Sequence, residues 1–229
     1  MLTCRYAAYR SPWQGNLLAE IVKVSTQDPE RPPLEYAASL IHIGKVIAIP
    51  TDTFYGLAAD PFNLNAVQQV YAIKGRPERK ALPILVRSLE QAEGLAAGLP
   101  EAFYMLARRF WPGALTIVVD ASQKIPLKVT GNTGRVALRW PNSSVACKLI
   151  ETADLPVTGT SANLSGFAPC VNANQVVKQL GDRLPLVLDG GESKALLPST
   201  IVELRGSAWH VVREGAIPEQ EIRDTLAGL

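Results

Sequence analysis

The 229-residue sequence predicts an α/β fold in which helices pack around a large twisted sheet. Short apolar runs alternate with stretches of helical periodicity along most of the chain. With 47% hydrophobic residues, the chain is long and apolar enough to bury a substantial core. Prolines and glycines are spread evenly, and neither an internal repeat nor a low-complexity segment interrupts the pattern. We therefore expect a single domain.

One shift in composition occurs near the N-terminus. Residues 26–33, Thr-Gln-Asp-Pro-Glu-Arg-Pro-Pro, are too rich in proline and charge to predict a regular helix or strand. The regular pattern begins after them. We therefore divide the chain into an N-terminal extension, residues 1–33, which we expect to pack as an arm, and a domain of residues 34–229.

Within that domain, apolar runs of strand length and helical patterns follow one another. Strands are expected at residues 46–49, 84–86, 115–119, 135–138, 157–159, 186–188, 200–204 and 209–212. Helices are expected at residues 65–74, 101–110 and 144–151. This alternation of strands and helices is typical of α/β domains.

Charge and cysteine content exclude several classes of protein. The 23 Lys and Arg nearly balance the 21 Asp and Glu, so the net charge of +2 predicts no general polyanion-binding surface, and any basic site must be local. Three distant cysteines without a CxxC pair, and only two histidines, disfavour a zinc site or a disulfide framework. No signal peptide and no apolar run of about 18 residues is present. We expect a soluble cytoplasmic protein that holds no metal through its own residues and does not associate with a membrane.

The first motif, Pro-Thr-Asp-Thr-Phe-Tyr-Gly-Leu at residues 50–57, directly follows the strand expected at 46–49. Open α/β sheets bind ligands at the carboxyl ends of their strands, where this motif places two threonines, Asp52 and Tyr55. A turn in which Asp52 and the threonines only cap the backbone would use the same residue types. Both interpretations remain open on this motif alone.

The second motif, Lys-Gly-Arg-Pro-Glu-Arg-Lys at residues 74–80, has four cations within seven residues at the end of an expected helix. Cations favour helix C-termini, so a solvated helix end is one interpretation. A polyphosphate clamp is the other, because lysine presents point charges and arginine a planar fork to phosphate oxygens. Gly75 and Pro77 favour the clamp, since they end the helix and stiffen the turn that carries the cations.

The third motif, Thr-Gly-Thr-Ser-Ala-Asn-Leu-Ser-Gly at residues 158–166, again follows an apolar strand. Small hydroxyl residues, an amide and glycines allow close backbone approach to a nucleotide or phosphate. A loop whose hydroxyls are satisfied internally is the alternative. No GxxxxGK[ST] or GxGxxG occurs, so a common kinase or dehydrogenase is disfavoured.

These motifs belong to seven ordered blocks. The blocks are PTDTFYGL at 50–57, KGRP at 74–77, WPGALT at 111–116, VALR at 136–139, SANLSG at 161–166, PSTIV at 198–202 and REGAI at 213–217. In this order the sequence resembles the YrdC-like threonylcarbamoyl-AMP synthases, in their short single-domain form. The resemblance implies a mixed sheet around a concave basic cavity that holds ATP and threonine side by side.

The resemblance also assigns roles to individual residues. It implies that Lys74 and Arg76 are the catalytic cations. It implies ATP contacts for Arg76, Lys80, Ser161, Asn163 and Arg213, and threonine contacts for Thr53, Arg139 and Ser199. The sequence departs from the family pattern at Ala81, where proline is frequent, at Leu85, where histidine can stand in the threonine pocket, and at Arg135, where a small hydroxyl residue can contact ATP. We expect Arg135 to add a further cation to the ATP site.

The implied reaction needs no protein nucleophile. L-Threonine and bicarbonate form a carbamate, whose oxygen attacks the α-phosphorus of ATP in line and expels pyrophosphate. The lysine and arginine residues, with Mg²⁺, stabilise the charge that develops on pyrophosphate. The product, threonylcarbamoyl-AMP, then serves a tRNA threonylcarbamoyl transferase in forming N6-threonylcarbamoyladenosine, and weak contact with tRNA is expected.

Two other functions use parts of the same pattern. An RNA-binding module could use the basic cavity to bind phosphates of structured RNA, although aromatic residues, at 7%, are sparse for base stacking. Carbamoyl transfer, as in hydrogenase-maturation proteins with a related domain, is disfavoured because the zinc-finger cysteines of those proteins are missing. Threonine-dependent consumption of ATP would separate the enzyme from the binding module.

Overall fold

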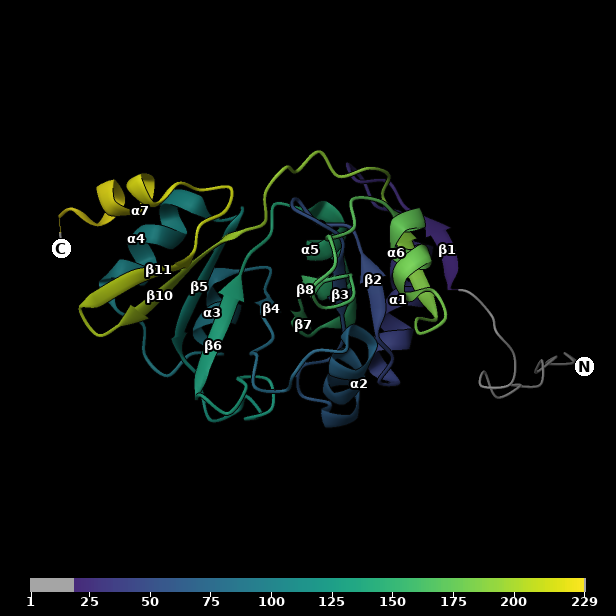
Figure 1. Ribbon diagram of the computed structural model, residues 1–229, viewed down its shortest axis with the longest axis horizontal. Helices are drawn as coiled ribbons and strands as arrows, with labels where there is room; N and C mark the ends of the chain where they lie inside the picture. The colour runs from purple at the N-terminus through teal and green to yellow at the C-terminus, as the bar shows by residue number, and fades with distance from the viewer. Residues whose placement is uncertain (1–18, 229) are drawn as a thin grey trace, which may run out of the picture.

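The computed structural model describes residues 19–228. Residues 1–18, which form most of the predicted extension and include Cys4, lie outside the described residues, as does Leu229. The predicted α/β class and the mixed strand pairing are confirmed, but the strands form two sheets instead of one large sheet. The two sheets lie next to each other along the long axis of the molecule (Figure 1).

The first sheet has five strands in the order β1-β9-β2-β3-β8. They are β1 (Glu20–Lys23), β9 (Leu186–Asp189), β2 (Ile47–Ile49), β3 (Gly56–Ala58) and β8 (Thr160–Ser161). Strand β9 pairs in parallel with β1 and β2, whereas β3 pairs antiparallel with β2 and β8. The turn between β2 and β3 carries the first motif, so it lies at the carboxyl end of a buried strand, as predicted.

The second sheet has six strands in the order β11-β10-β5-β6-β4-β7. They are β11 (Ala208–Arg213), β10 (Thr200–Arg205), β5 (Leu115–Asp120), β6 (Arg135–Arg139), β4 (Ile84–Leu85) and β7 (Val157–Thr158). The pairs β10 with β5 and β4 with β6 are parallel, and the other pairs are antiparallel. The ends of β6 and β11 and the start of β10 lie toward the first sheet.

The chain crosses from one sheet to the other at Gly159, which separates β7 from β8. A Cβ atom at this position would stand 2.5 Å from Cδ2 of Leu85, so the strands approach this closely only because residue 159 has no side chain. Thr158, the residue before Gly159 and the last of β7, donates from Oγ1 to the carbonyl oxygen of Leu57 in β3 at 2.9 Å. The single strand predicted at 157–159 is therefore two short strands in different sheets.

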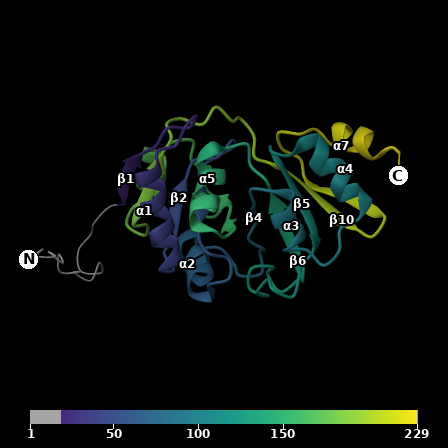
Figure 2. The ribbon, with the colours of Figure 1, turned by 180° about the vertical axis from the view of Figure 1, so that it is seen from behind.

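Helices cover the outer faces of both sheets. They are α1 (Arg31–His42), α2 (Leu64–Lys74), α3 (Leu89–Glu93), α4 (Glu101–Phe110), α5 (Ser144–Ala153), α6 (Ala173–Leu180) and α7 (Glu219–Leu226). From behind, α1 and α5 lie in front of the five-stranded sheet, and α3 and α4 in front of the six-stranded sheet (Figure 2). One hydrophobic core extends under both sheets, and a second lies beneath α1 and α5. Among residues 19–228, no helix is long and apolar enough to cross a bilayer.

The segment before residue 34 is more regular than the sequence predicts. Helix α1 begins at Arg31, so the prediction of irregular structure through residue 33 is wrong. Pro32 and Pro33 stand in the first turn, where a missing backbone N–H removes no helical hydrogen bond. Strand β1 pairs with β9, with Glu20 beside Leu186, so part of the predicted extension belongs to the sheet.

Candidate functional site

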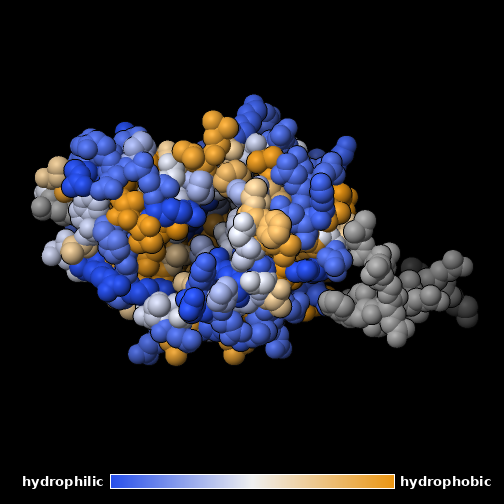
Figure 3. Space-filling view, in the orientation of Figure 1, coloured by the Kyte–Doolittle hydropathy of each residue, from blue (hydrophilic) through white to orange (hydrophobic). Residues whose placement is uncertain are grey.

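The predicted site residues converge where the two sheets face each other. The turn after β2, the end of α2 and the loop after β8 come from the first half, and the end of β6, the start of β10 and the end of β11 come from the second. In the space-filling view the surface is hollowed between the two halves (Figure 3). The site therefore depends on segments that are distant in sequence and is formed only by the folded chain.

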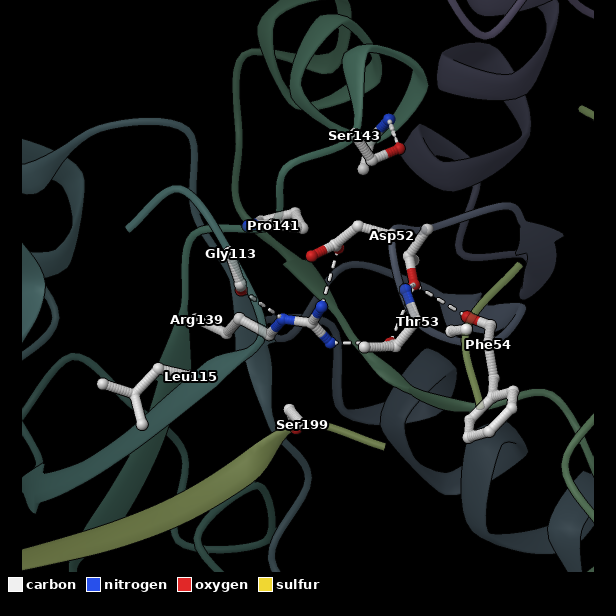
Figure 4. Close-up of polar contacts among 12 residues, drawn as sticks. Asp52, Thr53, Phe54, Gly113, Leu115, Arg139, Pro141, Ser143 and Ser199 are labelled. Carbon is white, nitrogen blue, oxygen red and sulfur yellow. Dashed lines mark hydrogen bonds and ion pairs between the residues drawn. The ribbon is translucent and has the colours of Figure 1, made fainter. Parts of the chain in front are cut away.

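Arg139, at the end of β6, has a hydrogen-bond partner for each nitrogen of its guanidinium group. Nε donates to the carbonyl oxygen of Gly113 at 3.0 Å, Nη1 to Oγ1 of Thr53 at 2.9 Å, and Nη2 to Oδ1 of Asp52 at 2.6 Å. Figure 4 shows the guanidinium between these groups, with Ser199 nearby. The side chains of Arg139 and Asp52 are only 7% and 15% exposed, so this ion pair is buried.

The turn after β2 explains how Thr53 and Asp52 face Arg139. Thr51 accepts a hydrogen bond at Oγ1 from the backbone N–H of Thr53 (3.1 Å) and donates from Oγ1 to the carbonyl oxygen of Phe54 (2.7 Å). Thr51 therefore caps the turn. Asp52 and Thr53 are left to contact Arg139. Backbone capping, one interpretation of this motif, therefore applies to Thr51, and a place in the candidate site, the other, applies to Asp52 and Thr53.

Ser199 and Arg213 are held together by two of the late motifs. Arg213 donates from Nη2 to the carbonyl oxygen of Ser199 at 2.6 Å, and Oγ of Ser199 lies 2.9 Å from Oγ1 of Thr116. A Cβ atom on Gly215 would stand 2.2 Å from the carbonyl oxygen of Pro198, so only glycine permits this close approach. The motifs at 198–202 and 213–217 are thus one local structure.

Lys74, the last residue of α2, is buried and bonded to the third motif. Its Nζ donates to the carbonyl oxygen of Ser161, to that of Asn163 at 2.8 Å, and to Oδ1 of Asn163 at 3.3 Å. The Asn163 amide donates from Nδ2 to the carbonyl oxygens of Leu164 and Phe167, each at 2.8 Å. The polar groups of Lys74 and Asn163 are therefore satisfied within the protein.

Arg76 differs from Lys74 although it is only two residues away. Its Nη1 donates to Oγ1 of Thr160 at 3.1 Å and its Nη2 to the carbonyl oxygen of Ala81 at 2.8 Å. Its Nε is buried and has no hydrogen-bond partner among the described residues. A buried N–H without a partner is costly, and an anionic ligand would supply the missing acceptor.

Four cations, namely Lys74, Arg76, Arg139 and Arg213, gather at this site and repel one another. Burial, and then the charge of Arg76, lower the pKa of Lys74 to about 8. Burial lowers the pKa of Arg76, which Tyr71 partly offsets and Arg213 lowers further. Partial desolvation of the guanidinium and the neighbouring Arg139 lower the pKa of Arg213. Among residues 19–228, the only carboxylate that pairs with any of these cations is Asp52, so the site has an excess of positive charge that an anion would neutralise.

Two predicted ATP-contacting residues are not part of this group. Lys80 lies exposed in the turn after α2. Arg135 stands at the opposite end of β6 from Arg139, about 13 Å away at the usual rise per residue. Its guanidinium pairs with Asp120 at 2.5 Å and Glu203 at 3.2 Å, carboxylates on the neighbouring β5 and on β10. The structure thus does not support the expectation that Arg135 adds a cation to the site.

Several polar residues that shape the site had no contact assigned to them from the sequence. Asp52, Thr160 and Thr116 contact Arg139, Arg76 and Ser199, and all three lie within the quoted motifs. Their positions in the motifs were the available signal. Leu85 is 2% exposed, pairs in register with Arg139, and places an apolar side chain beside Gly159.

The chain is thus a two-sheet α/β protein with a group of cations where the sheets meet, and comparison with known proteins identifies the family. The family model Sua5_yciO_yrdC, described as "Telomere recombination", matches residues 39–215. The chain therefore belongs to the Sua5/YciO/YrdC family.

Individual relatives agree with that assignment. The chain is 38% identical over 193 residues to a threonylcarbamoyl-AMP synthase of Pyrococcus abyssi, which covers 84% of this chain and 57% of the relative. It is 37% identical over 190 residues to a putative threonylcarbamoyl-AMP synthase of Mycobacterium tuberculosis strain H37Rv, covering 83% and 87%. The crystal structure of P. abyssi Sua5 complexed with L-threonine matches with a TM-score of 0.87 and 37% identity, over 90% of this chain and 61% of that one. The chain thus spans little more than half of the P. abyssi protein.

Proposed function

We propose that the chain forms threonylcarbamoyl-AMP and pyrophosphate from L-threonine, bicarbonate and ATP, for N6-threonylcarbamoyladenosine in tRNA. The observation that carries the proposal is the group of cations formed by the buried Lys74 and Arg139, the half-buried Arg76 and the exposed Arg213, with Asp52 as their one ion-pair partner among the described residues. Such a charge excess suits a substrate pair that brings one carboxylate and a triphosphate. The same reaction is supported by the two relatives, of which one is a threonylcarbamoyl-AMP synthase and the other a putative threonylcarbamoyl-AMP synthase.

On the amino-acid side, Arg139 would receive the threonine carboxylate. Its guanidinium is already bonded on every nitrogen, so the substrate carboxylate would compete with Asp52 for Nη2. The hydroxyls of Thr53 and Ser199 lie beside this position and suit a substrate hydroxyl. Threonine binding would thus replace the ion pair between Arg139 and Asp52 with one between Arg139 and the substrate carboxylate. Because one ion pair is lost for each one gained, this side of the site favours selectivity over affinity.

On the phosphate side, Arg76 and Arg213 would bind the triphosphate, and the exposed Lys80 could reach it from the rim. The carbamate oxygen attacks the α-phosphorus in line, and negative charge grows on the departing pyrophosphate. The guanidinium of Arg76 is held by Thr160 and the carbonyl oxygen of Ala81, so its charge is oriented before the reaction and little reorganisation is needed.

Mg²⁺ is the usual companion of ATP, and the residues that the structure describes do not form a protein site for it. Residues 19–228 contain no group of three or more His, Cys, Asp and Glu that could hold a metal ion. Asp52, the carboxylate that pairs with one of the cations, is held by Arg139. A Mg²⁺ ion would therefore have to be bound chiefly by the phosphate oxygens of ATP.

RNA binding as the main function is disfavoured by the burial of two of the cations, Lys74 and Arg139. Lys74 and Arg139 are 3% and 6% exposed, and the phosphate backbone of a duplex cannot reach such groups. We propose that any tRNA contact is weak and that a separate tRNA threonylcarbamoyl transferase takes the product.

The proposal is tested by following pyrophosphate release from ATP with purified full-length chain, omitting one substrate at a time. We expect release only when threonine and bicarbonate are both present. Release that is unchanged without threonine would refute the proposal, and tight RNA binding without any release would favour the binding module.

A further inference from the structure

Lys74 belongs by sequence to the cation-rich motif at residues 74–80, but its ammonium group contacts protein acceptors and not a ligand. An ammonium group has three N–H donors. All three face protein acceptors, namely the carbonyl oxygens of Ser161 and Asn163 and Oδ1 of Asn163. With 3% of the residue exposed, no donor of Lys74 remains for a phosphate oxygen.

The acceptors of Lys74 are themselves fixed. Ser161 donates from Oγ to Oδ1 of Asn163 at 2.5 Å, and the backbone N–H of Ser165 donates to the carbonyl oxygen of Lys74 at 2.8 Å. The amide of Asn163 donates to Leu164 and Phe167. The end of α2 and the loop at residues 161–167 are therefore joined by one buried network, in which each polar group depends on the others.

This network connects directly to Arg76. Thr160, which accepts from Nη1 of Arg76 at 3.1 Å, immediately precedes Ser161. A shift of the loop would move Thr160 and with it the guanidinium of Arg76. Small displacements of a charge-stabilising group reduce turnover strongly, because the transition state requires its exact position more than initial binding does.

We propose that Lys74 is a positioning residue that does not contact the phosphates. It holds residues 160–163, which are β8 and the start of the loop after it, and through Thr160 it orients Arg76. The inference rests on the proposed function, because it assigns Arg76 as the residue that meets the triphosphate. The two cations of one motif then have different roles: Arg76 contacts the triphosphate, and Lys74 only positions Arg76.

The test compares Lys74→Met with the matched Arg76→Met, both in the full chain. Inorganic tripolyphosphate affinity is measured by calorimetry, and kcat is measured from threonine-dependent pyrophosphate release at saturating ATP. Arg76→Met should lose about ten- to a hundred-fold in tripolyphosphate affinity, the size of one charge-assisted contact. Lys74→Met should lose no more than about five-fold, from its charge alone, while kcat falls by at least about ten-fold.

Asn163→Ala provides a second variant that leaves every cation in place, which matters if Lys74→Met does not fold. It should keep tripolyphosphate affinity and lose kcat, and adding Lys74→Met should lower kcat little further because both act through one network. The inference is overturned if Lys74→Met loses as much tripolyphosphate affinity as Arg76→Met, or if kcat is unchanged in both Lys74→Met and Asn163→Ala. If the parent neither binds tripolyphosphate nor releases pyrophosphate, the proposed function itself has failed.

Discussion

The two sides of the site hold their positive charge differently. One side is Arg139 with Asp52, Thr53 and Ser199, and the other is Arg76 with Thr160 and Arg213. Arg139 is bonded through each nitrogen and paired with a carboxylate. Within residues 19–228, Arg76 has no carboxylate partner, and its Nε has no acceptor. The first side is complete before a ligand arrives and can only exchange partners, whereas the second gains a partner when an anion binds. We expect selectivity to come from the Arg139 side and affinity from the Arg76 side.

The largest expected effect concerns the amino acid. If the hydroxyls of Thr53 and Ser199 recognise the threonine hydroxyl, valine should be used less efficiently than threonine by several powers of ten, because those groups would stay buried and unpaired. 2-Aminobutyrate, which also lacks the hydroxyl, should be as poor. Serine, which lacks only the methyl group, should lose about ten- to two-hundred-fold. Pyrophosphate release measured as kcat/KM for the four amino acids tests this, and valine equal to threonine would contradict it.

Arg139→Met should destabilise the fold and abolish threonine-dependent turnover. Removing one member of a buried ion pair commonly costs about 3 to 5 kcal/mol, because Asp52 is left charged and unpaired. Denaturant unfolding measures the change. The double variant with Asp52→Asn is the control and should recover part of the lost stability. An Arg139→Met protein as stable as its parent would show that the pair contributes nothing.

Arg139→Lys is a milder variant of the same position. A lysine ammonium cannot reproduce a two-pronged contact with a carboxylate, so use of every amino acid should fall together. A variant that uses threonine normally would remove Arg139 from the carboxylate site.

Arg76→Ala should have the opposite profile from Arg139→Met. We expect kcat/KM for ATP to fall about ten- to a hundred-fold. Stability should change little, because the substitution also removes a buried charge that repels Lys74 and Arg213. Steady-state kinetics and denaturant unfolding on the same preparation separate the two quantities. Normal use of ATP by a folded Arg76→Ala protein would remove Arg76 from the phosphate site.

Arg135→Ala should have the smallest effect on catalysis. Because Arg135 pairs with Asp120 and Glu203 at the far end of β6, kcat/KM for ATP per folded molecule should stay within about three-fold of the parent. A loss as large as that of Arg76→Ala would show that the nucleotide extends along β6.

The periodic parts of the fold could be predicted from the sequence. The helix at 101–110 matches α4 at both ends, and the strand at 115–119 matches β5 to within one residue. The short strand β3 (Gly56–Ala58) was missed because three buried residues show no alternation. The division into two sheets was missed because it depends on which strands pair, and paired strands such as β2 and β9 are distant in sequence.

The site was predictable to the level of motifs. The motifs indicated which cations would gather, and Thr53, Arg139, Ser199 and Arg213 do lie together. Sequence could not show which acceptors each cation would reach. Lys74 and Arg76 look equivalent in the motif, but only the folded chain places three acceptors around the first and leaves a donor of the second unpaired.

The most direct test of the account is to identify the product. The purified chain is incubated with ATP, L-threonine and ¹³C-labelled bicarbonate, and the nucleotides are analysed by mass spectrometry. The account predicts threonylcarbamoyl-AMP that carries the label from bicarbonate, formed together with pyrophosphate and greatly reduced in Arg76→Ala. ATP converted to pyrophosphate with no labelled threonylcarbamoyl adduct, or no conversion at all by folded protein, would contradict it.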